Sequence, residues 1–303
     1  MDSQNRTAWR VATLVAVLLI PLHTYAAHPA PLAKAEPQPP ASQAVQPQVD
    51  KRTADTTQQK QRELMTEAQP AITETENALK ALDEKRNRDA LAALATATGK
   101  LELILARSPK LALAPVRTDV LTHDLLAKND TVKAAIKDVR DLLRDGEVQK
   151  ARQLMQGLAS EVEFRTFSIP LETYPAAIKA ITPLIDAGKV EEAKTELRTM
   201  LNTLVVTTEV VPLPTLRAEE QIKAAQALAE KANRSKEEND KLAQSIAAAR
   251  DQLKIAELLG YGDKKDDKPT YQQIDDLDKK TAGGKWGKGW FEKIRQQLAA
   301  WRA

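Results

Sequence analysis

The sequence has no cysteine and only three histidines in 303 residues. Without cysteine the chain forms neither a disulfide nor a thiolate site, so burial and packing must stabilise the fold. A zinc site needs more imidazole or thiolate ligands than this chain has. We therefore expect no metal and no other cofactor.

The few histidines also leave little for acid–base catalysis. Once residues 1–26 are removed, only His28 and His123 remain. His123 is followed by Asp124, but neighbours on a helix diverge by about 100°, so we do not expect an oriented catalytic pair. We expect His123 to be structural, and whether it senses pH is left open.

Other catalytic patterns are incomplete. Residues 97–100, Ala-Thr-Gly-Lys, resemble part of a phosphate-binding loop, but Leu94 replaces its first glycine and Leu101 replaces the Ser or Thr that would bind magnesium. Acidic residues are mixed with lysines and arginines as on solvated helix surfaces, which gives no support for a glycosidase pair. We predict that the chain is not an enzyme.

The first 26 residues have the pattern of a secretory signal peptide. Arg6 and Arg10 precede an apolar run at residues 11–20, which is about half the roughly 20 residues of a membrane-spanning helix. We predict cleavage after Ala26 and a periplasmic location. Cleavage leaves 43 basic and 41 acidic residues, a near-neutral balance that predicts no nucleic-acid partner.

Two segments have the composition of linkers. Residues 27–59 are rich in Pro, Ala and Gln and have almost no large apolar side chain, so we predict a disordered linker. Residues 261–284 contain Pro269 and the pair Gly283 and Gly284 among charged residues, and they are predicted to form a second flexible linker.

Residues 60–260 are predicted to form one helical domain built on an internal repeat. Residues 136–171 align with residues 178–213 at a constant offset of 42. Apolar residues recur at helical spacing on both sides of a glycine, Gly146 in one copy and Gly188 in the other. Glycine there permits the left-handed turn that ends a helix, so each copy is predicted to be an antiparallel hairpin that packs on the other.

Weaker patterns accompany the repeat. A fainter third copy at residues 75–109, offset by 61 from the first, lacks the glycine. Each clear copy ends in a β-branched or aromatic run, at residues 162–169 and 204–211. These runs are either helix ends or a short two-stranded ribbon. The predicted fold is thus mainly α, with antiparallel helical hairpins stacked as a bundle.

Residues 285–303 have the pattern of a basic amphipathic helix. Such a helix suits an anionic membrane surface or a groove on a partner, and the alternative is that it folds back as an end cap of the helical domain. The candidate contact residues are Trp286, Trp290, Phe291, Ile294, Leu298 and Trp301, with the cations Lys288, Lys293 and Arg295.

From about residue 65 to 260 the sequence resembles the YfdX family of bacterial exported proteins. The residues that carry the likeness are Ala177-Ile178-Lys179, Gly188 with Glu192-Ala193 and Leu197, Val-Val-Pro-Leu at 210–213 and Lys-Ala-Ala-Gln-Ala-Leu at 223–228. The resemblance implies a helical periplasmic protein linked to heat and acid stress, with a chaperone-like role.

Two functions fit these features best. The first is an ATP-independent periplasmic chaperone that binds unfolded or stressed client proteins between its helical hairpins. Acid would protonate many of the 41 carboxylates and loosen a homo-oligomer by charge repulsion, so client binding should rise. The alternative is a membrane-associated envelope adaptor or structural protein that docks through its C-terminal helix. Binding of a small ligand in a helical groove is a third option.

Overall fold

The structure is a computed structural model of the chain, and it describes residues 39–262 and 264–300. The predicted signal peptide, His28 and Trp301 lie outside the described residues. The helices are α1 (Pro40–Arg62), α2 (Gln69–Asp83), α3 (Asn87–Arg107), α4 (Asn129–Arg144), α5 (Val148–Gln156), α6 (Tyr174–Asp186), α7 (Val190–Leu201), α8 (Leu213–Ala229), α9 (Lys236–Leu259), α10 (Lys264–Thr281), the 3-10 turn η1 (Ala282–Gly284) and α11 (Glu292–Ala300). The strands are β1 (Leu113–His123), β2 (Glu161–Pro170) and β3 (Val205–Pro212).

Three successive units, each a helical hairpin followed by a strand, make up the middle of the chain. α2, α3 and β1 form the first unit, α4, α5 and β2 the second, and α6, α7 and β3 the third. Their strands form one antiparallel sheet in the order β1-β2-β3. The mainly helical fold and the repeated hairpins are confirmed, and the faint third copy is a complete unit.

The turns inside the three hairpins share one backbone geometry. Gly146 and Gly188 have φ angles of 76° and 73°, in the left-handed region that glycine adopts without strain. Lys85 takes the equivalent position of the first unit with φ of 59°. In all three turns the next amide donates a hydrogen bond of 2.8 Å to the carbonyl five residues earlier, which closes the helix end.

The two β-branched runs pair as strands, which decides between the two alternatives in favour of the ribbon, here part of a three-stranded sheet. Val162 of β2 lies opposite Val211 of β3, and Ser168 lies opposite Val205, so these runs are not helix ends. The sequence pattern did not predict β1, which pairs along the other side of β2. Its first half contains Pro115 and a register irregularity, which hide the alternation expected of a strand.

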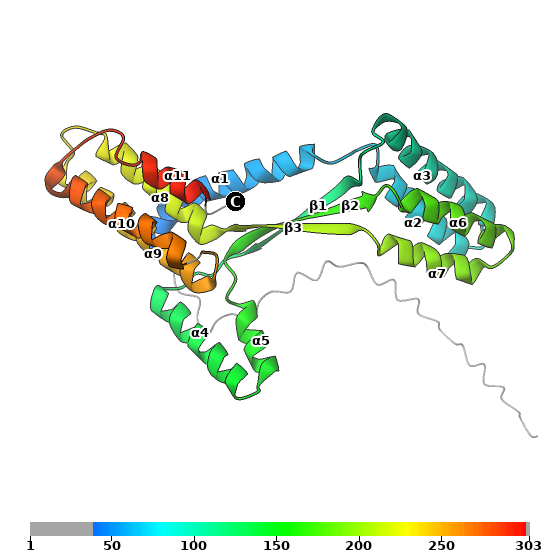
Figure 1. Cartoon of the computed structure of the whole chain (residues 1–303), viewed down its shortest axis with the longest axis horizontal. Helices are drawn as coiled ribbons and strands as arrows, with labels where there is room; N and C mark the ends of the chain where they lie inside the picture. Colours follow the sequence, from blue (N-terminus) through cyan, green and yellow to red (C-terminus); the bar gives the residue numbers. More distant parts are fainter. Residues whose placement is uncertain (1–38, 263, 301–303) are drawn as a thin grey trace, which may run out of the picture.

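The strand directions determine where each hairpin lies (Figure 1). Adjacent antiparallel strands begin at opposite ends of a sheet, so the hairpins before β1 and β3 lie at one end and the hairpin before β2 lies at the other. At the first end, which we name the stacked end, α2/α3 and α6/α7 pack together around a core that includes Leu94, Leu101, Tyr174, Ile178 and Leu197. Stacking of hairpins is thus confirmed, but it joins the first and third units.

The other end of the sheet, which we name the open end, holds the remaining helices. α8 pairs with α9, and α10 and α11 close a core that includes Ile222, Leu253, Ile274 and Phe291. α4 packs against α9, so the prediction that the two clear repeat copies pack on each other is wrong. α1 lies along α8 and runs past the sheet (Figure 1).

Two segments predicted as flexible linkers contain helices. Residues 40–59 form most of α1, in which Val45 and Val49 are buried, and Ala and Gln are good helix formers. Residues 264–281 form α10, in which Ile274 and Leu277 are buried. A few apolar side chains pack each of these helices against the rest of the molecule. The average composition of the segment does not reveal such isolated contacts. The predicted boundaries at residues 60 and 260 therefore do not delimit the helical unit.

The C-terminal helix is shorter than predicted. It begins at Glu292, and residues 285–291 form a non-helical connection that includes Gly289 with φ of 76°. None of the described helices combines the length and apolarity that crossing a membrane requires.

Candidate functional site

The hairpin α4/α5 leaves apolar side chains in water at positions that its repeat equivalents bury. Leu143 is 46% exposed, whereas Leu82 and Ile185, at the same place in the other hairpins, are each 2% exposed. Met155 is 52% exposed, whereas its equivalent Leu197 is fully buried. The repeat unit thus has the same apolar face at both ends of the sheet. At the open end Val132 and Val139 of that face are buried, whereas Leu143 and Met155 are not.

Stacking accounts for this difference. The equivalents of Leu143, Val148 and Met155 in the third unit all belong to, or pack against, the core shared with α2/α3. α4 instead packs against α9 through a small cluster around Val132, which lies on the same side of α4 as Leu143 but nearer the start of the helix. We name Leu143, Val148 and Met155 the hairpin face, since repeat geometry places them on one side of α4/α5.

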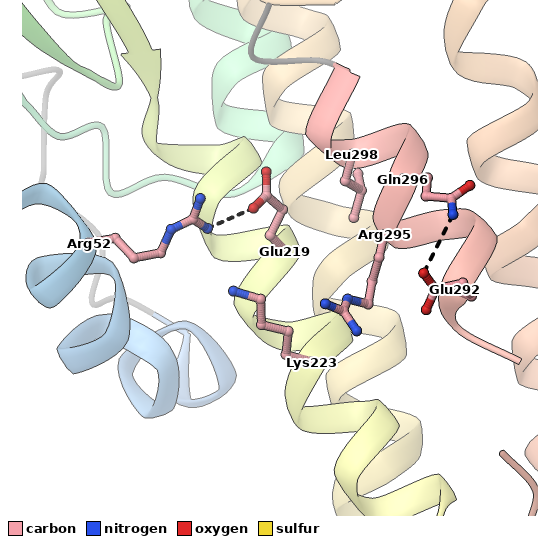
Figure 2. Close-up of a pocket in the computed structure, with 7 residues that line it drawn as sticks. All are labelled: Arg52, Glu219, Lys223, Glu292, Arg295, Gln296 and Leu298. Atoms are coloured by element: carbon pink, nitrogen blue, oxygen red, sulfur yellow. Dashed lines mark hydrogen bonds and ion pairs between the residues drawn. The ribbon is translucent and has the colours of Figure 1, made fainter. Parts of the chain in front are cut away.

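A charged pocket of about 340 Å³ lies between α1, α8 and α11 at the open end (Figure 2). Each of these helices contributes one cation, Arg52 from α1, Lys223 from α8 and Arg295 from α11. The carboxylates of Glu219 and Glu292 and the side chains of Gln296 and Leu298 complete the lining. Close packing of three cations requires acidic partners.

Ion pairs at this pocket hold α1 on α8. Arg52 Nη1 donates to Glu219 Oε2 at 2.6 Å, shown in Figure 2, and to Glu220 Oε1 at 3.0 Å. Lys223 Nζ donates to the same Glu220 oxygen at 2.6 Å. Burial lowers the pKa of Arg52. The charges and hydrogen bonds of Glu219 and Glu220 raise it by a larger amount, so the pKa of Arg52 lies above its ordinary value.

A fully buried cation, Arg217, lies on α8. Arg217 is 2% exposed and donates to both carboxylate oxygens of Asp124, at 2.9 and 2.6 Å. It also donates to Gln46 Oε1 of α1, at 3.2 and 3.0 Å. Arg217 thus joins α8, α1 and the connection between β1 and α4. A two-pronged contact of this kind fixes orientation as well as distance.

The underside of α1 covers an apolar patch of the sheet. Val49 packs with Val162 and Phe164 of β2 and with Leu213 and Leu216 of α8. It is the only residue of the described part of α1 in that cluster. A hollow of about 230 Å³ separates α1 from the sheet beside it. Charged and polar contacts therefore provide much of the attachment of α1. We name the contacts of Arg52 with Glu219 and Glu220, and of Gln46 with Arg217, the α1 clamp.

The α1 clamp extends to the edge of the sheet. Lys60, near the end of α1, lies 2.7 Å from Glu209 of β3. The hydrogen bond to Glu209 raises the pKa of Lys60 above its ordinary value. Lys60 and Glu209 are 149 residues apart in the sequence, and Arg52 and Glu219 are 167 apart. Helix and strand periodicity link only near neighbours, so the α1 clamp was not predicted.

His123 and Asp124 are not an oriented pair, for a different reason from the one predicted. His123 ends β1 rather than lying on a helix, and the carboxylate of Asp124 is bound by Arg217. His123 Nε2 lies 3.8 Å from Glu163. Among the described residues there is no group of three or more His, Asp or Glu side chains placed to hold a metal ion.

The predicted contact residues of the C-terminal segment fall into two groups. Phe291, Ile294 and Leu298 are buried in the core of α8, α9 and α10, with Trp290 packed against it, as in the end-cap alternative. The remaining described residues of the set, Trp286, Lys288, Lys293 and Arg295, are exposed. Arg295 and Leu298 also line the charged pocket, so this segment contributes to the site in a way that the sequence did not predict.

Comparison with known proteins finds a family model that matches the repeat region. Residues 71–210 match the family model described as YfdX protein. A solved structure of Salmonella Typhi YfdX has 18% sequence identity and a TM-score of 0.34, over 50% of this chain and 93% of that chain. No curated protein matches the chain. Arg52, Arg217 and Lys223 lie outside the matched residues. The YfdX resemblance indicated by the sequence is thus confirmed for residues 71–210.

Proposed function

We propose that this chain is a periplasmic stress-protective protein that binds unfolded client proteins without ATP and without catalysing a reaction. The observation that carries the proposal is the hairpin face. Its apolar side chains are exposed, although the same positions are buried where two hairpins stack. An unfolded client offers the apolar segments that the missing hairpin would supply, and burial of such surface favours binding without an energy source.

The α1 clamp supports an increase of binding in acid. Acid reduces the negative charge of carboxylates in general, which would leave Arg52, Lys223 and Arg295 facing one pocket as three like charges. Repulsion among them, together with the loss of the Arg52 pairs, favours movement of α1 away from α8. The apolar patch at Phe164 and Leu216 would then add to the surface available to clients.

Aggregation suppression tests the hairpin face. The full mature chain is expected to slow aggregation of a model client, and Leu143→Gln combined with Met155→Gln is expected to remove most of that effect. Leu103→Gln is the matched control, because Leu103 is 62% exposed on α3 at the stacked end. A wild-type chain that fails to slow aggregation at both neutral and acid pH would refute the proposal.

The acid step has its own matched pair on α1. Arg52→Gln is expected to raise client binding at neutral pH toward its acid level. Lys51→Gln removes the same charge one residue away, where Lys51 pairs only within α1, with Asp55. Equal binding by the two variants at neutral pH would show that the α1 clamp does not control the surface.

A membrane-associated adaptor is the second candidate. It is favoured by Trp286, which is 56% exposed between the exposed cations Lys285 and Lys288. Deleting the C-terminal segment from residue 285 onward would also remove Phe291 and Leu298 from the core of α8, α9 and α10. The double change Trp286→Ala and Lys288→Glu is therefore the better test. Flotation of the wild type on anionic vesicles, lost in this variant, would support the adaptor function.

A further inference from the structure

β3 is an edge strand whose outer side is open. It pairs with β2 on one side, and residues 205–210 are all exposed. Three of them are valines, with Val205, Val206 and Val210 exposed by 36%, 47% and 42%. Among the described residues, no hydrogen bond from outside the sheet reaches the backbone of residues 205–211. An edge of this kind is a template for pairing with another strand.

The opposite edge of the same sheet is protected. The carbonyl of Pro115 in β1 accepts a hydrogen bond from Met65 N at 2.7 Å, and that of Val116 accepts one from Gln69 Nε2 at 3.1 Å. The register of β1 shifts between Pro115 and Arg117. Proline, a bulge and a covering segment are the usual ways in which proteins block an edge. Before Pro212 at its end, β3 has no proline, and its pairing with β2 has no bulge. The two edges therefore differ in what they can bind.

The sequence of β3 is nearly the same when it is reversed, differing only at residues 207 and 209. Residues 205–211 read Val-Val-Thr-Thr-Glu-Val-Val. An antiparallel pair centred on Thr208 sets Val206 opposite Val210 of a second copy, and Thr207 opposite Glu209, with no like charges opposed. A slip of one residue would place Glu209 opposite Val206. Valine pairs on one face of an antiparallel sheet are stabilising, so the Thr208 register is preferred.

We propose that two copies of this chain pair their β3 strands antiparallel about Thr208, forming one six-stranded sheet. Each β3 gains hydrogen bonds for its outer backbone groups, and Val206 and Val210 of both copies meet on the same face. The proposal is independent of client binding, since it uses the edge of the sheet and not the hairpin face.

Cysteine cross-linking tests the register, because the chain has no cysteine of its own. Residue 208 of one copy would lie opposite residue 208 of the other copy, with their Cβ atoms about 4.5–5.5 Å apart. Two cysteines at this distance can form a disulfide after a small adjustment of the backbone. Thr208→Cys is expected to give a covalent dimer on mild oxidation, and Thr122→Cys, exposed on β1, is expected to stay monomeric on a non-reducing gel. Equal cross-linking of the two variants, or none with Thr208→Cys, would overturn the proposal.

Sedimentation velocity of the full mature chain gives the second test. The wild type and Thr208→Ser are expected to be dimers, and Thr208→Lys, which opposes two like charges, is expected to raise the dimer dissociation constant about tenfold or more. Thr122→Lys is the control. A monomeric wild type, or a Thr208→Lys dimer as stable as the wild type, contradicts the pairing. Circular dichroism of each variant checks that the fold is retained.

Discussion

At the stacked end of the sheet the hairpins α2/α3 and α6/α7 pack on each other and bury Ile185 and Leu197, whereas at the open end α4/α5 leaves the equivalent Leu143 and Met155 in water. The repeat unit is the same, so the difference comes from its neighbours. An antiparallel sheet of three strands provides two hairpins at one end and one at the other. The odd number of units therefore leaves one hairpin, α4/α5, without a second hairpin to cover Leu143 and Met155.

The two ends also differ in what holds them together. Among the described residues, no charged side chain of α2, α3, α6 or α7 is buried, and the ion pair of Lys194 with Asp83 joins these hairpins outside their core. At the open end α8 buries Arg217, Glu219 and Glu220, and ion pairs attach α1 to it. An apolar core responds little to pH, whereas buried ion pairs depend on the charge of both partners. We infer that the stacked end is the permanent scaffold and the open end responds to conditions.

The largest expected difference is between equivalent core positions. Leu197→Ala should lower the free energy of unfolding by about 3 kcal/mol, because it leaves a cavity in the stacked end. Met155→Ala, at the equivalent exposed position, should change it by less than about 0.5 kcal/mol. Denaturant unfolding of both variants checks this. Similar losses would mean that the hairpin face is covered in solution.

Arg217→Met should have the next largest effect, confined to the open end. It leaves the carboxylate of Asp124 without its buried partner, at a cost of about 2–3 kcal/mol because Asp124 is partly exposed. Hydrogen exchange should increase in α1 and α8 and stay unchanged in α2 and α3. Matching increases at the two ends would show that the molecule opens as one unit.

The hairpin turns allow a smaller comparison within the repeat. Gly188→Ala should destabilise by about 1 kcal/mol, since a Cβ there meets no atom and the cost comes only from the positive φ. Lys85→Gly should stabilise by a similar amount, because it relieves the same strain in the first unit. Thermal unfolding would measure both. A loss of stability with Lys85→Gly would mean that the lysine side chain has a stabilising contact.

The smallest expected effect concerns alkaline pH. The pKa of Lys60 is raised in the folded state by Glu209, so its stabilising contribution is complete below the unfolded pKa of 10.5 and is lost as pH rises through the folded value. The contribution is below about 1 kcal/mol, as for other partly exposed pairs. α1 should therefore exchange faster above this pH. Lys60→Met should remove that part of the pH dependence, and an unchanged profile would contradict the assignment.

The sequence predicted those parts of the fold that local residues determine. Gly146 and Gly188 mark their turns because the left-handed backbone favours glycine, whereas Lys85 gave no signal at the turn of the first unit. β1 was missed because Pro115 and the shifted register interrupt its alternation. α1 was missed because long-range contacts hold it in place, including a pair between Arg52 and Glu219, 167 residues apart.

The candidate site was predictable only in part. The repeat alignment made Met155 the equivalent of Leu197. The exposure of Met155 depends on the order of the strands in the sheet, and the alignment gives no information about that order. Arg295 and Leu298 were singled out as contacts of the C-terminal helix, and their place in a pocket with Arg52 follows from tertiary packing.

Hydrogen exchange of the mature chain in complex with an unfolded model client tests the central claim most directly. If the unpartnered hairpin is the client surface, the client should slow exchange across residues 129–156 and leave residues 69–107 unchanged. Slower exchange at the stacked end, or no change across residues 129–156 in a chain that suppresses aggregation, would contradict it.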